Sequence, residues 1–442
     1  MSQHRFTGLL DWLNRWLSAG QGIDGRLVAL GAVALYWAAV GLAAVGGVDL
    51  WRVLGVPSGP ILFVDTHNLT AAAECAQHGV DPFLDNPCDV DDRVWNYSRL
   101  WLVVAWLGVD DSWRIPLGVG HVLAFLAMVW LLVGRLTLGQ GIVLAVLLVS
   151  PAFMFAMEHG QADLLMFVVV AASAVLWRRP AWGWLAGPLL VALAGALKLF
   201  PIVALGAYGL ARHGRALVVT LLAGLGFLAY TLATLEDTRL IAERAPQGQV
   251  HSYGARILVG RAVHLILGEG AGPGGVARQI LAALTVVAVL GFVAWWASRV
   301  RQRRVSNGEQ PVSWRLHAFH LGALVYVGSF LAANNWDYRL IFLALLLPQL
   351  FVWIGDRASP LRALAGLGLV AVVAQSYLGA TLAYPTLHRD SVDWGNVPTW
   401  MLADEVVSWT LAGLLTALLV PSARSALAAA SRRLASRHQQ PG

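Results

Sequence analysis

Charge is scarce in this chain of 442 residues: Asp, Glu, Lys and Arg make up 13% of it, whereas 58% of the residues are hydrophobic. Soluble globular domains carry about 25% charged residues, so this deficit excludes an ordinary soluble protein. Lysine is nearly absent, since Lys198 stands alone beside 30 arginines. Apolar runs of roughly 17–23 residues recur between Arg26 and Pro421, each long enough to cross a hydrocarbon core of about 30 Å.

These runs predict an all-α polytopic membrane protein, because helices satisfy their own backbone hydrogen bonds inside a bilayer. About twelve spans are expected within a transmembrane domain of residues 27–422. They lie approximately at 27–48, 113–134, 139–157, 162–177, 181–197, 200–212, 214–234, 277–299, 314–332, 339–354, 361–383 and 402–420. The sixth is too short to cross unless it is a half-helix. An even number of spans places both ends of the chain on one side of the membrane.

Positive charge decides which side that is, because arginine and lysine collect in cytoplasmic connections. The N-terminal segment, the even-numbered connections and the tail hold 19 arginines and four acidic residues, whereas the other side holds 11 arginines, Lys198 and 21 acidic residues. Both termini are therefore expected in the cytoplasm. The composition, rich in Ala, Gly and Arg, is typical of a bacterium of high GC content, so the inner (cytoplasmic) membrane of a bacterium is the expected location. The pI of about 9.7 follows from this orientation and does not suggest a nucleic-acid partner.

The segments outside the spans have distinct patterns. Residues 1–26 are expected to form a cytoplasmic amphipathic segment, because their apolar residues recur at helical spacing. Residues 423–442 are a basic cytoplasmic tail. Residues 49–112 and 235–276 form two large extracytoplasmic loops, and the first is expected to contain interfacial helices.

Both cysteines, Cys75 and Cys88, lie in the first of these loops with 12 residues between them. Two cysteines in one extracytoplasmic loop predict a disulfide; two free thiols are the alternative. Closing a loop of this size would stiffen the segment by about 3 kcal/mol in the chain-entropy model. Such stiffening matters most where side chains must be held in place.

The first polar group in this loop contains Asp65 and His67, soon after the first span. Asp65 precedes a predicted short interfacial helix over 69–78, so it could simply be the N-cap of that helix. It could also be a general base, because a partly desolvated carboxylate at the edge of the bilayer can take a proton from a hydroxyl group. One residue can do both.

A second group, Glu158-His159-Gly160-Gln161-Ala162-Asp163, lies between the third and fourth spans. The residues after Asp163 are apolar, so this carboxylate lies at or just inside the membrane, where an ionisable group is a functional hypothesis by default. The alternative is a helix cap, with His159 as a hydrogen-bonded turn residue. The group has no spacing typical of a metal site, so a structural metal site is not expected here. No cofactor is expected, and a divalent metal is the alternative left open.

Two further groups carry basic residues. Lys198 is embedded in the apolar sequence Ala-Leu-Lys-Leu-Phe-Pro, where Pro201 ends or kinks the helix. It either snorkels to the interface or binds an anionic group that enters from the lipid. Asp337 and Arg339 precede the tenth span. They either pair and cap, or supply an acceptor for a sugar hydroxyl and a contact for a phosphate.

Together these residues resemble glycosyltransferase family 87. The resemblance rests on Asp65 after the first span, His159-Gly160-Gln161-Ala162-Asp163, Ala196-Leu197-Lys198-Leu199-Phe200-Pro201 and Asn335-Trp336-Asp337-Tyr338-Arg339-Leu340. That family has the GT-C membrane fold and includes the polyprenol-phosphate-mannose-dependent mannosyltransferases of mycobacteria. The chain departs from the pattern in the first loop, where Asn86-Pro87-Cys88-Asp89 and Asn96-Tyr97-Ser98-Arg99 replace a Tyr-Pro-Pro-like segment.

The resemblance implies a hexosyltransferase that uses a sugar on a polyprenyl phosphate, acts on the extracytoplasmic face, and has Asp65 as its catalytic base. Mannose is the first expectation for the sugar and arabinose the second; the acceptor is expected to be a glycolipid or a polysaccharide. On this hypothesis transfer inverts the anomeric centre. The expected donor-phosphate ligands are Lys198, Arg339 and His159, and the expected sugar or acceptor ligands are Asp163, Gln161, Asp337, Asn335 and His67.

Two other classes fit less well. A transporter or lipid flippase usually has polar residues near the middle of the membrane, on broken helices and within internal repeats. Here the charges gather at the outer edge and no repeat is evident, although the short span near Pro201 is compatible with a flippase. A ligase or polymerase of lipid-linked oligosaccharides uses a diphosphate leaving group and favours arginine-rich outer loops, whereas these loops are net acidic.

Overall fold

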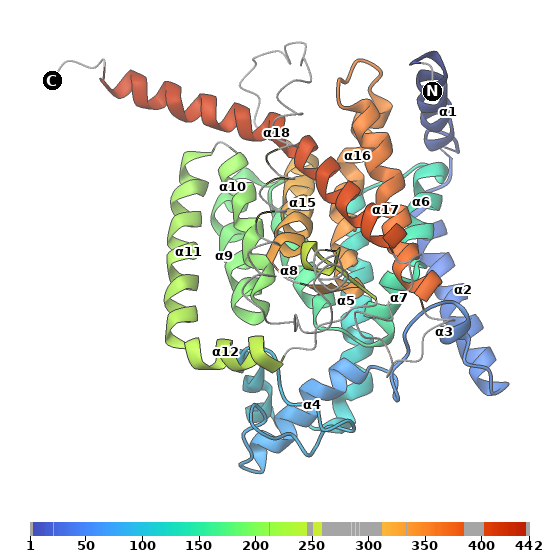
Figure 1. Cartoon of the computed structure of the whole chain (residues 1–442), viewed down its shortest axis with the longest axis vertical. Helices are drawn as coiled ribbons and strands as arrows, with labels where there is room; N and C mark the ends of the chain where they lie inside the picture. The colour runs from blue at the N-terminus through green and yellow to red at the C-terminus, as the bar shows by residue number, and fades with distance from the viewer. Residues whose placement is uncertain are drawn as a thin grey trace.

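We describe the protein from a computed structural model. It describes residues 3–20, 22–211, 213–244, 251–258, 312–332, 334–383 and 402–438, together with Leu284, Ala288 and Gly291. Within these ranges the chain is helical apart from its connections and one pair of two-residue strands. Figure 1 shows α1 (Gln3–Leu17) and the C-terminal part of α18 (Leu402–His438) at one end of the helix bundle, and α4 (Val64–Gln77) and α12 (Leu235–Arg244) at the opposite end.

The described helices include six that are long and apolar enough to cross a membrane. These are Gly25–Val45, Asp111–Val133, Gly214–Ala233, Asp337–Gly355, Arg362–Gly379 and Ala403–Arg432. A seventh span arises if α6 (Leu138–Leu148) and α7 (Pro151–Glu158), which are bent by 59°, are taken together. The prediction of an all-α polytopic membrane protein agrees with this architecture.

Eleven of the twelve predicted spans coincide with described helices, and the span predicted at 277–299 lies outside the described residues apart from Leu284, Ala288 and Gly291. The elements are α2 (Gly25–Val45), α5 (Arg114–Val133), α6, α7, α8 (Asp163–Leu176), α9 (Pro180–Lys198), η3 (Phe200–Leu205), α10 (Gly206–Leu210), α11 (Gly214–Ala233), α15 (Trp314–Ala332), η4 (Asp337–Leu346), α16 (Leu347–Gly355), α17 (Arg362–Ala383) and α18. Several, such as α8 with its 14 residues, are too short to cross straight through a bilayer, since a helix rises 1.5 Å per residue. The count of twelve spans therefore stays a prediction.

The predicted amphipathic segment forms α1, which buries Leu10 and Leu17 and exposes Leu9 and Trp12. It is held by Arg362, whose guanidinium donates to the α1 backbone and to an acidic side chain of that helix. Its position relative to a membrane stays a prediction.

The first loop contains α3 (Leu50–Val53), α4, and the 3-10 helices η1 (Arg99–Leu107) and η2 (Asp111–Trp113). The predicted disulfide is confirmed, because Cys75 and Cys88 are bonded with 5.9 Å between their Cα atoms. The helix predicted over 69–78 begins earlier, at Val64. Of the two roles considered for Asp65, that of N-cap does not hold. Phe63 occupies that position in a left-handed conformation, so Asp65 lies in the first turn with its side chain available for other contacts.

The centre of the bundle is formed by α7, α8, α15 and η4, and every residue of α7 is buried. The second large loop reaches this centre through β1 (Ser252–Tyr253), which pairs antiparallel with β2 (Asn335–Trp336). Consequently the ends of α4, α8, α9 and η4 that carry the polar groups singled out in the sequence are fixed by packed helices.

Candidate active site

The carboxylate of Asp65 lies between the first loop and the turn after α7. Its Oδ1 is 3.1 Å from Nη1 of Arg93, and its Oδ2 accepts a hydrogen bond from Nε2 of Gln161 at 2.8 Å. The backbone N–H of Asp65 donates to the carbonyl of His159 at 3.0 Å, which docks the start of α4 against that turn. The side chain is 15% exposed. A carboxylate can accept about four hydrogen bonds, so Asp65 retains acceptor capacity for a further hydroxyl.

Gln161 connects this carboxylate with the single lysine. Its buried carboxamide donates through Nε2 to Asp65, while Oε1 accepts from Nζ of Lys198 at 3.0 Å and from the hydroxyl of Tyr97 at 3.0 Å. The opposite orientation of the amide would point its oxygen at a carboxylate and its NH₂ group at an ammonium, so the charges on both sides fix it. Burial raises the pKa of the Tyr97 hydroxyl well above its usual range, with a further effect from Asp65, so Tyr97 stays protonated and donates.

Lys198, Asp163 and Arg339 form the other half of the site. Nζ of Lys198 is 2.8 Å from Oδ1 of Asp163, and Nε of Arg339 is 3.5 Å from Oδ2 of the same carboxylate, which has no exposed surface. Lys198 also lies over the ring of Tyr97, with 4.5 Å between Nζ and the ring centroid, and faces Tyr338 at 5.5 Å. Aromatic faces attract a cation that has lost its water.

The helix ends explain why these charges are tolerated at the edge of the apolar region. Asp163 is the first residue of α8 and Lys198 the last of α9. A carboxylate at the N-terminus and an ammonium at the C-terminus each complement the helix dipole. The predicted break at Pro201 is present, since α9 ends at Lys198 and η3 starts at Phe200. The indole N–H of Trp101, from η1, donates to the carbonyl of Leu197 and anchors the end of α9.

The Asn335–Arg339 group divides between two surroundings. Asn335 is buried and donates to the carbonyl of Ser329 at 2.7 Å, while its side-chain oxygen accepts from Arg339. Asp337 instead points toward α17 and α18: a Cβ added at Gly379 would lie 2.7 Å from Oδ2 of Asp337 and 3.2 Å from Oδ2 of Asp404. The alternative in which Asp337 simply pairs with Arg339 is therefore not what is observed.

The two predicted histidines make contacts of a different kind. Nε2 of His67 accepts from the backbone N–H of Val90 at 3.0 Å, so Nδ1 carries the proton and donates to Asp111. Nδ1 of His159 pairs with Glu158, and its ring packs edge-on against Phe155. These contacts lend no support to His67 as a sugar or acceptor ligand or to His159 as a phosphate ligand. Both roles stay predictions.

Sequence reasoning did not single out two residues that touch the site, Arg93 and Tyr97. Tyr97 lies within a segment noted only as a departure from the family pattern. Arg93 is one of several charged residues in the first loop, and nothing in the local sequence indicates that it folds back onto Asp65. Among the residues that the structure describes, no group of three or more His, Cys, Asp and Glu side chains could hold a metal ion.

The packed apolar helices identify an all-α polytopic membrane protein. Its buried polar site lies at the ends of these helices. Residues 100–258, about a third of the chain, match the model of glycosyltransferase family 87. The matched segment contains Gln161, Asp163 and Lys198, while Asp65 and Arg339 lie outside it. Comparison with curated proteins and with solved structures found no match. The family match indicates a glycosyltransferase, and the apolar helices indicate that it is membrane-bound.

Proposed function

We propose that the protein transfers a sugar from a polyprenyl phosphate to a lipid or glycan acceptor on the extracytoplasmic face of a bacterial inner membrane. The main support is one continuous set of contacts: Asp65 to Gln161, Gln161 to Lys198, Lys198 to Asp163, and Asp163 to Arg339. It joins a carboxylate with spare acceptor capacity to two fixed cations. An acceptor hydroxyl and an anionic leaving group require this combination.

In the proposed reaction Asp65 takes the proton of the acceptor hydroxyl. The hydroxyl oxygen attacks the anomeric carbon while the bond from that carbon to the phosphate oxygen breaks on the opposite face. The products are an inverted glycoside, a protonated Asp65 and a polyprenyl phosphate monoester. General-base catalysis of this kind contributes about 10²–10⁴-fold to a rate.

The cations act on the leaving phosphate, which gains negative charge as it departs. Both Lys198 and Arg339 are held in place by Asp163. This supports the proposal, because cations fixed before the reaction stabilise developing negative charge most effectively. Asp163 keeps both cations in position before the donor binds. Binding of a phosphate to either cation then adds a second anion, or replaces Asp163 in one contact. The lipid tail would remain in the bilayer, which is why a site at the ends of transmembrane helices suits such a donor.

The remaining assignments follow from the same contacts. Asn335 orients Arg339 through its side-chain oxygen. Mannose remains the first candidate for the sugar and arabinose the second. The contacts of Asp337 lead away from Lys198 and Arg339 toward α17 and α18, so its predicted contact with a sugar hydroxyl has the weakest support of the set.

The test is transfer by purified protein in liposomes, with radiolabelled polyprenyl phosphate mannose as donor and a glycolipid extract as acceptor. Asp65→Asn preserves size and can still bind Arg93, but it cannot take a proton. We expect transfer to fall at least about 100-fold, with donor binding retained. Asp85→Asn removes an exposed carboxylate from the same loop and should leave transfer unchanged. Transfer by Asp65→Asn at the rate of the unmodified protein would remove Asp65 from the role of base.

A further inference from the structure

The guanidinium of Arg93 contacts two carboxylates and a backbone carbonyl. Its Nη1 is 3.1 Å from Oδ1 of Asp65, and its Nη2 donates to the carbonyl of Val64 at 2.6 Å. The guanidinium also binds both carboxylate oxygens of Asp89, with Nε 3.1 Å from Oδ1 and Nη2 3.0 Å from Oδ2. This bidentate arrangement fixes the plane of the guanidinium as well as its position.

Asp89 is itself held in place. Its buried carboxylate accepts from Nδ2 of Asn68 on α4 at 2.9 Å and from the backbone N–H of Asp91 at 3.0 Å. Burial opposes its ionisation, but the hydrogen bonds from Arg93 and Asn68 prevail and hold the pKa of Asp89 below its usual value. The pKa of Arg93 is raised because Asp89 and Asp65 outweigh the effect of burial. Arg93 and Asp89 therefore remain a charged pair across the physiological range of pH.

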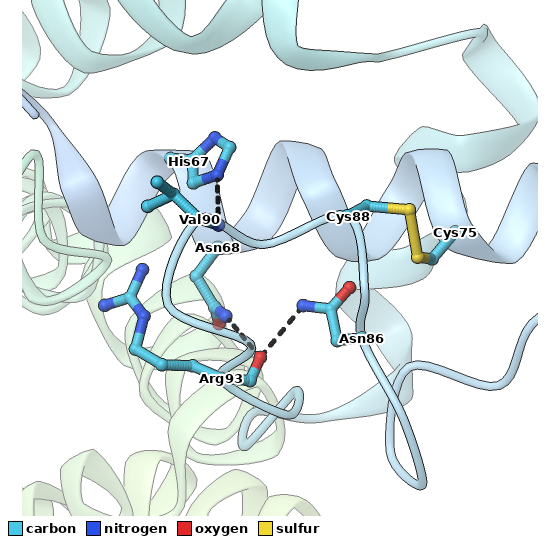
Figure 2. The surroundings of a disulfide bond; sticks show 7 residues. All are labelled: His67, Asn68, Cys75, Asn86, Cys88, Val90 and Arg93. Atoms are coloured by element: carbon cyan, nitrogen blue, oxygen red, sulfur yellow. Dashed lines mark hydrogen bonds between the residues drawn. A yellow bond between two sulfur atoms is a disulfide. The ribbon is translucent and has the colours of Figure 1, made fainter.

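The loop that carries this pair is attached to α4 at several points (Figure 2). The carbonyl of Arg93 accepts from Nδ2 of Asn68 at 3.0 Å and from Nδ2 of Asn86 at 2.9 Å. Val90 donates to His67, and the disulfide joins the loop to α4 beyond them. Asp65 lies at the start of α4, so the proposed base and Arg93 belong to one unit in which the disulfide and hydrogen bonds join the loop to α4.

We infer that Arg93 is a positioning residue for Asp65: it fixes the orientation of the carboxylate and places a compensating positive charge against it, so that the free lone pairs of Asp65 face the acceptor hydroxyl. The inference rests on the proposed function. Arg93 itself touches neither of the two cations assigned to the phosphate. Removing it would leave Oδ1 of Asp65 without this partner and would leave Asp89 as an uncompensated negative charge nearby.

The charged and titratable groups facing Asp65 come from several elements. Arg93, with Asp89 behind it, and Tyr97 lie in the first loop, and Lys198 lies at the end of α9 beyond Gln161; Tyr338 approaches from η4. The turn after α7 contributes a backbone carbonyl, that of His159. Arg93 is the one cation in direct contact with the carboxylate among the residues described.

The first measurement reads the carboxylate directly, without relying on transfer. A hydrophobic carbodiimide modifies a carboxyl group in its protonated form, and mass spectrometry quantifies the product at Asp65 as a function of pH. In Arg93→Gln, half-labelling should move to higher pH, because the carboxylate loses the opposite charge that contacts it. In Arg93→Lys the pH of half-labelling should rise less, because the lysine ammonium restores the positive charge but not the bidentate hydrogen bonds of the guanidinium.

The second measurement is transfer in liposomes with radiolabelled polyprenyl phosphate mannose. Misplacing a reacting group by about 1 Å costs about 100-fold, so kcat of Arg93→Gln should fall by up to that factor. The KM for the donor should be unchanged, the acidic limb of the pH–rate profile should move to higher pH, and Arg93→Lys should recover part of the loss.

The matched control is Arg99→Gln. Arg99 also pairs with two aspartates, Asp81 and Asp237, from a more exposed part of the same region and without contact to Asp65. Arg99→Gln should leave both the labelling profile of Asp65 and the pH–rate profile of transfer unchanged. An Arg93→Gln variant with the labelling profile of the unmodified protein would overturn the inference, and so would equal shifts in Arg99→Gln. If the unmodified protein transfers no sugar while the labelling shift is present, the proposed function fails and the positioning of Asp65 by Arg93 stands.

Discussion

Replacing Lys198 with methionine separates the structural role of the lysine from its proposed role in binding phosphate. Asp163 is fully buried, and Lys198 is the nearer of its two cations, at 2.8 Å against 3.5 Å for Arg339. Removing one partner of a buried ion pair typically costs about 3–5 kcal/mol, because the other charge is left uncompensated. Since Arg339 remains, we expect Lys198→Met to lower the free energy of unfolding by about 3 kcal/mol, the lower end of that range.

A second substitution tests whether the uncompensated charge of Asp163 causes this loss. Asp163→Asn removes that charge, so the double variant should lose about 0.5–3 kcal/mol less than the sum of the two single variants, which is the coupling expected of residues in contact. Transfer should stay low in the double variant, because it still lacks the proposed phosphate ligand. The free energies are measured by titrating the purified protein with denaturing detergent and following tryptophan fluorescence.

Arg135→Met provides the control, because it removes an exposed cation and should change stability by no more than about 0.5 kcal/mol. Donor binding is measured in the same four proteins of the cycle. Additive effects of Lys198→Met and Asp163→Asn on unfolding would refute the ion pair as the source of the loss. Unchanged donor affinity in folded Lys198→Met or in the folded double variant would refute the assignment of Lys198 to the phosphate.

Three further changes test other parts of the site. Gln161→Leu should lower transfer by about 10–100-fold with little change in expression, because it leaves the base and the lysine without their shared partner; liposome transfer at the unmodified rate would contradict this. Replacing Cys75 and Cys88 with serine should destabilise the first loop by about 3 kcal/mol, seen as faster hydrogen exchange in that loop; equal exchange in both proteins would show that other contacts suffice. Gly379→Ala should lower the unfolding transition temperature, because its Cβ would lie 2.7 Å from the carboxylate of Asp337, and an unchanged transition would mean that this carboxylate moves aside freely.

The sequence was a good guide to the apolar helices because their signal is strong and local. Every predicted span within the described residues coincides with helix, and the Pro201 break lies where proline chemistry requires it. The bend of 59° between α6 and α7 was not anticipated. Its signal is nevertheless visible, since Ser150-Pro151 is a common way to start a helix. A long apolar run obscures such a signal, because hydropathy alone does not distinguish a straight span from a broken one.

The sequence singled out the main members of the candidate site but not the contacts between them. Asp65, Lys198 and Asp163 stand out because a charge beside an apolar run is costly, and that cost is visible in the sequence. Arg93 does not stand out, because a charged residue in a polar loop has no such cost until the loop folds. The separation of Asp337 from Arg339 was equally hidden, since it depends on α17 and α18, which follow in the chain.

The order in which the parts of the site occur along the chain has a consequence for biogenesis. Lys198 leaves the ribosome long before Arg339, so Asp163 and Lys198 can pair and neutralise each other while the second cation is still being synthesised. The half-site made from α8 and α9 should therefore insert as a neutral pair, and β2 and η4 should close it afterwards. We expect a chain truncated before residue 312 to dock the first loop without completing the candidate site, because it lacks Arg339.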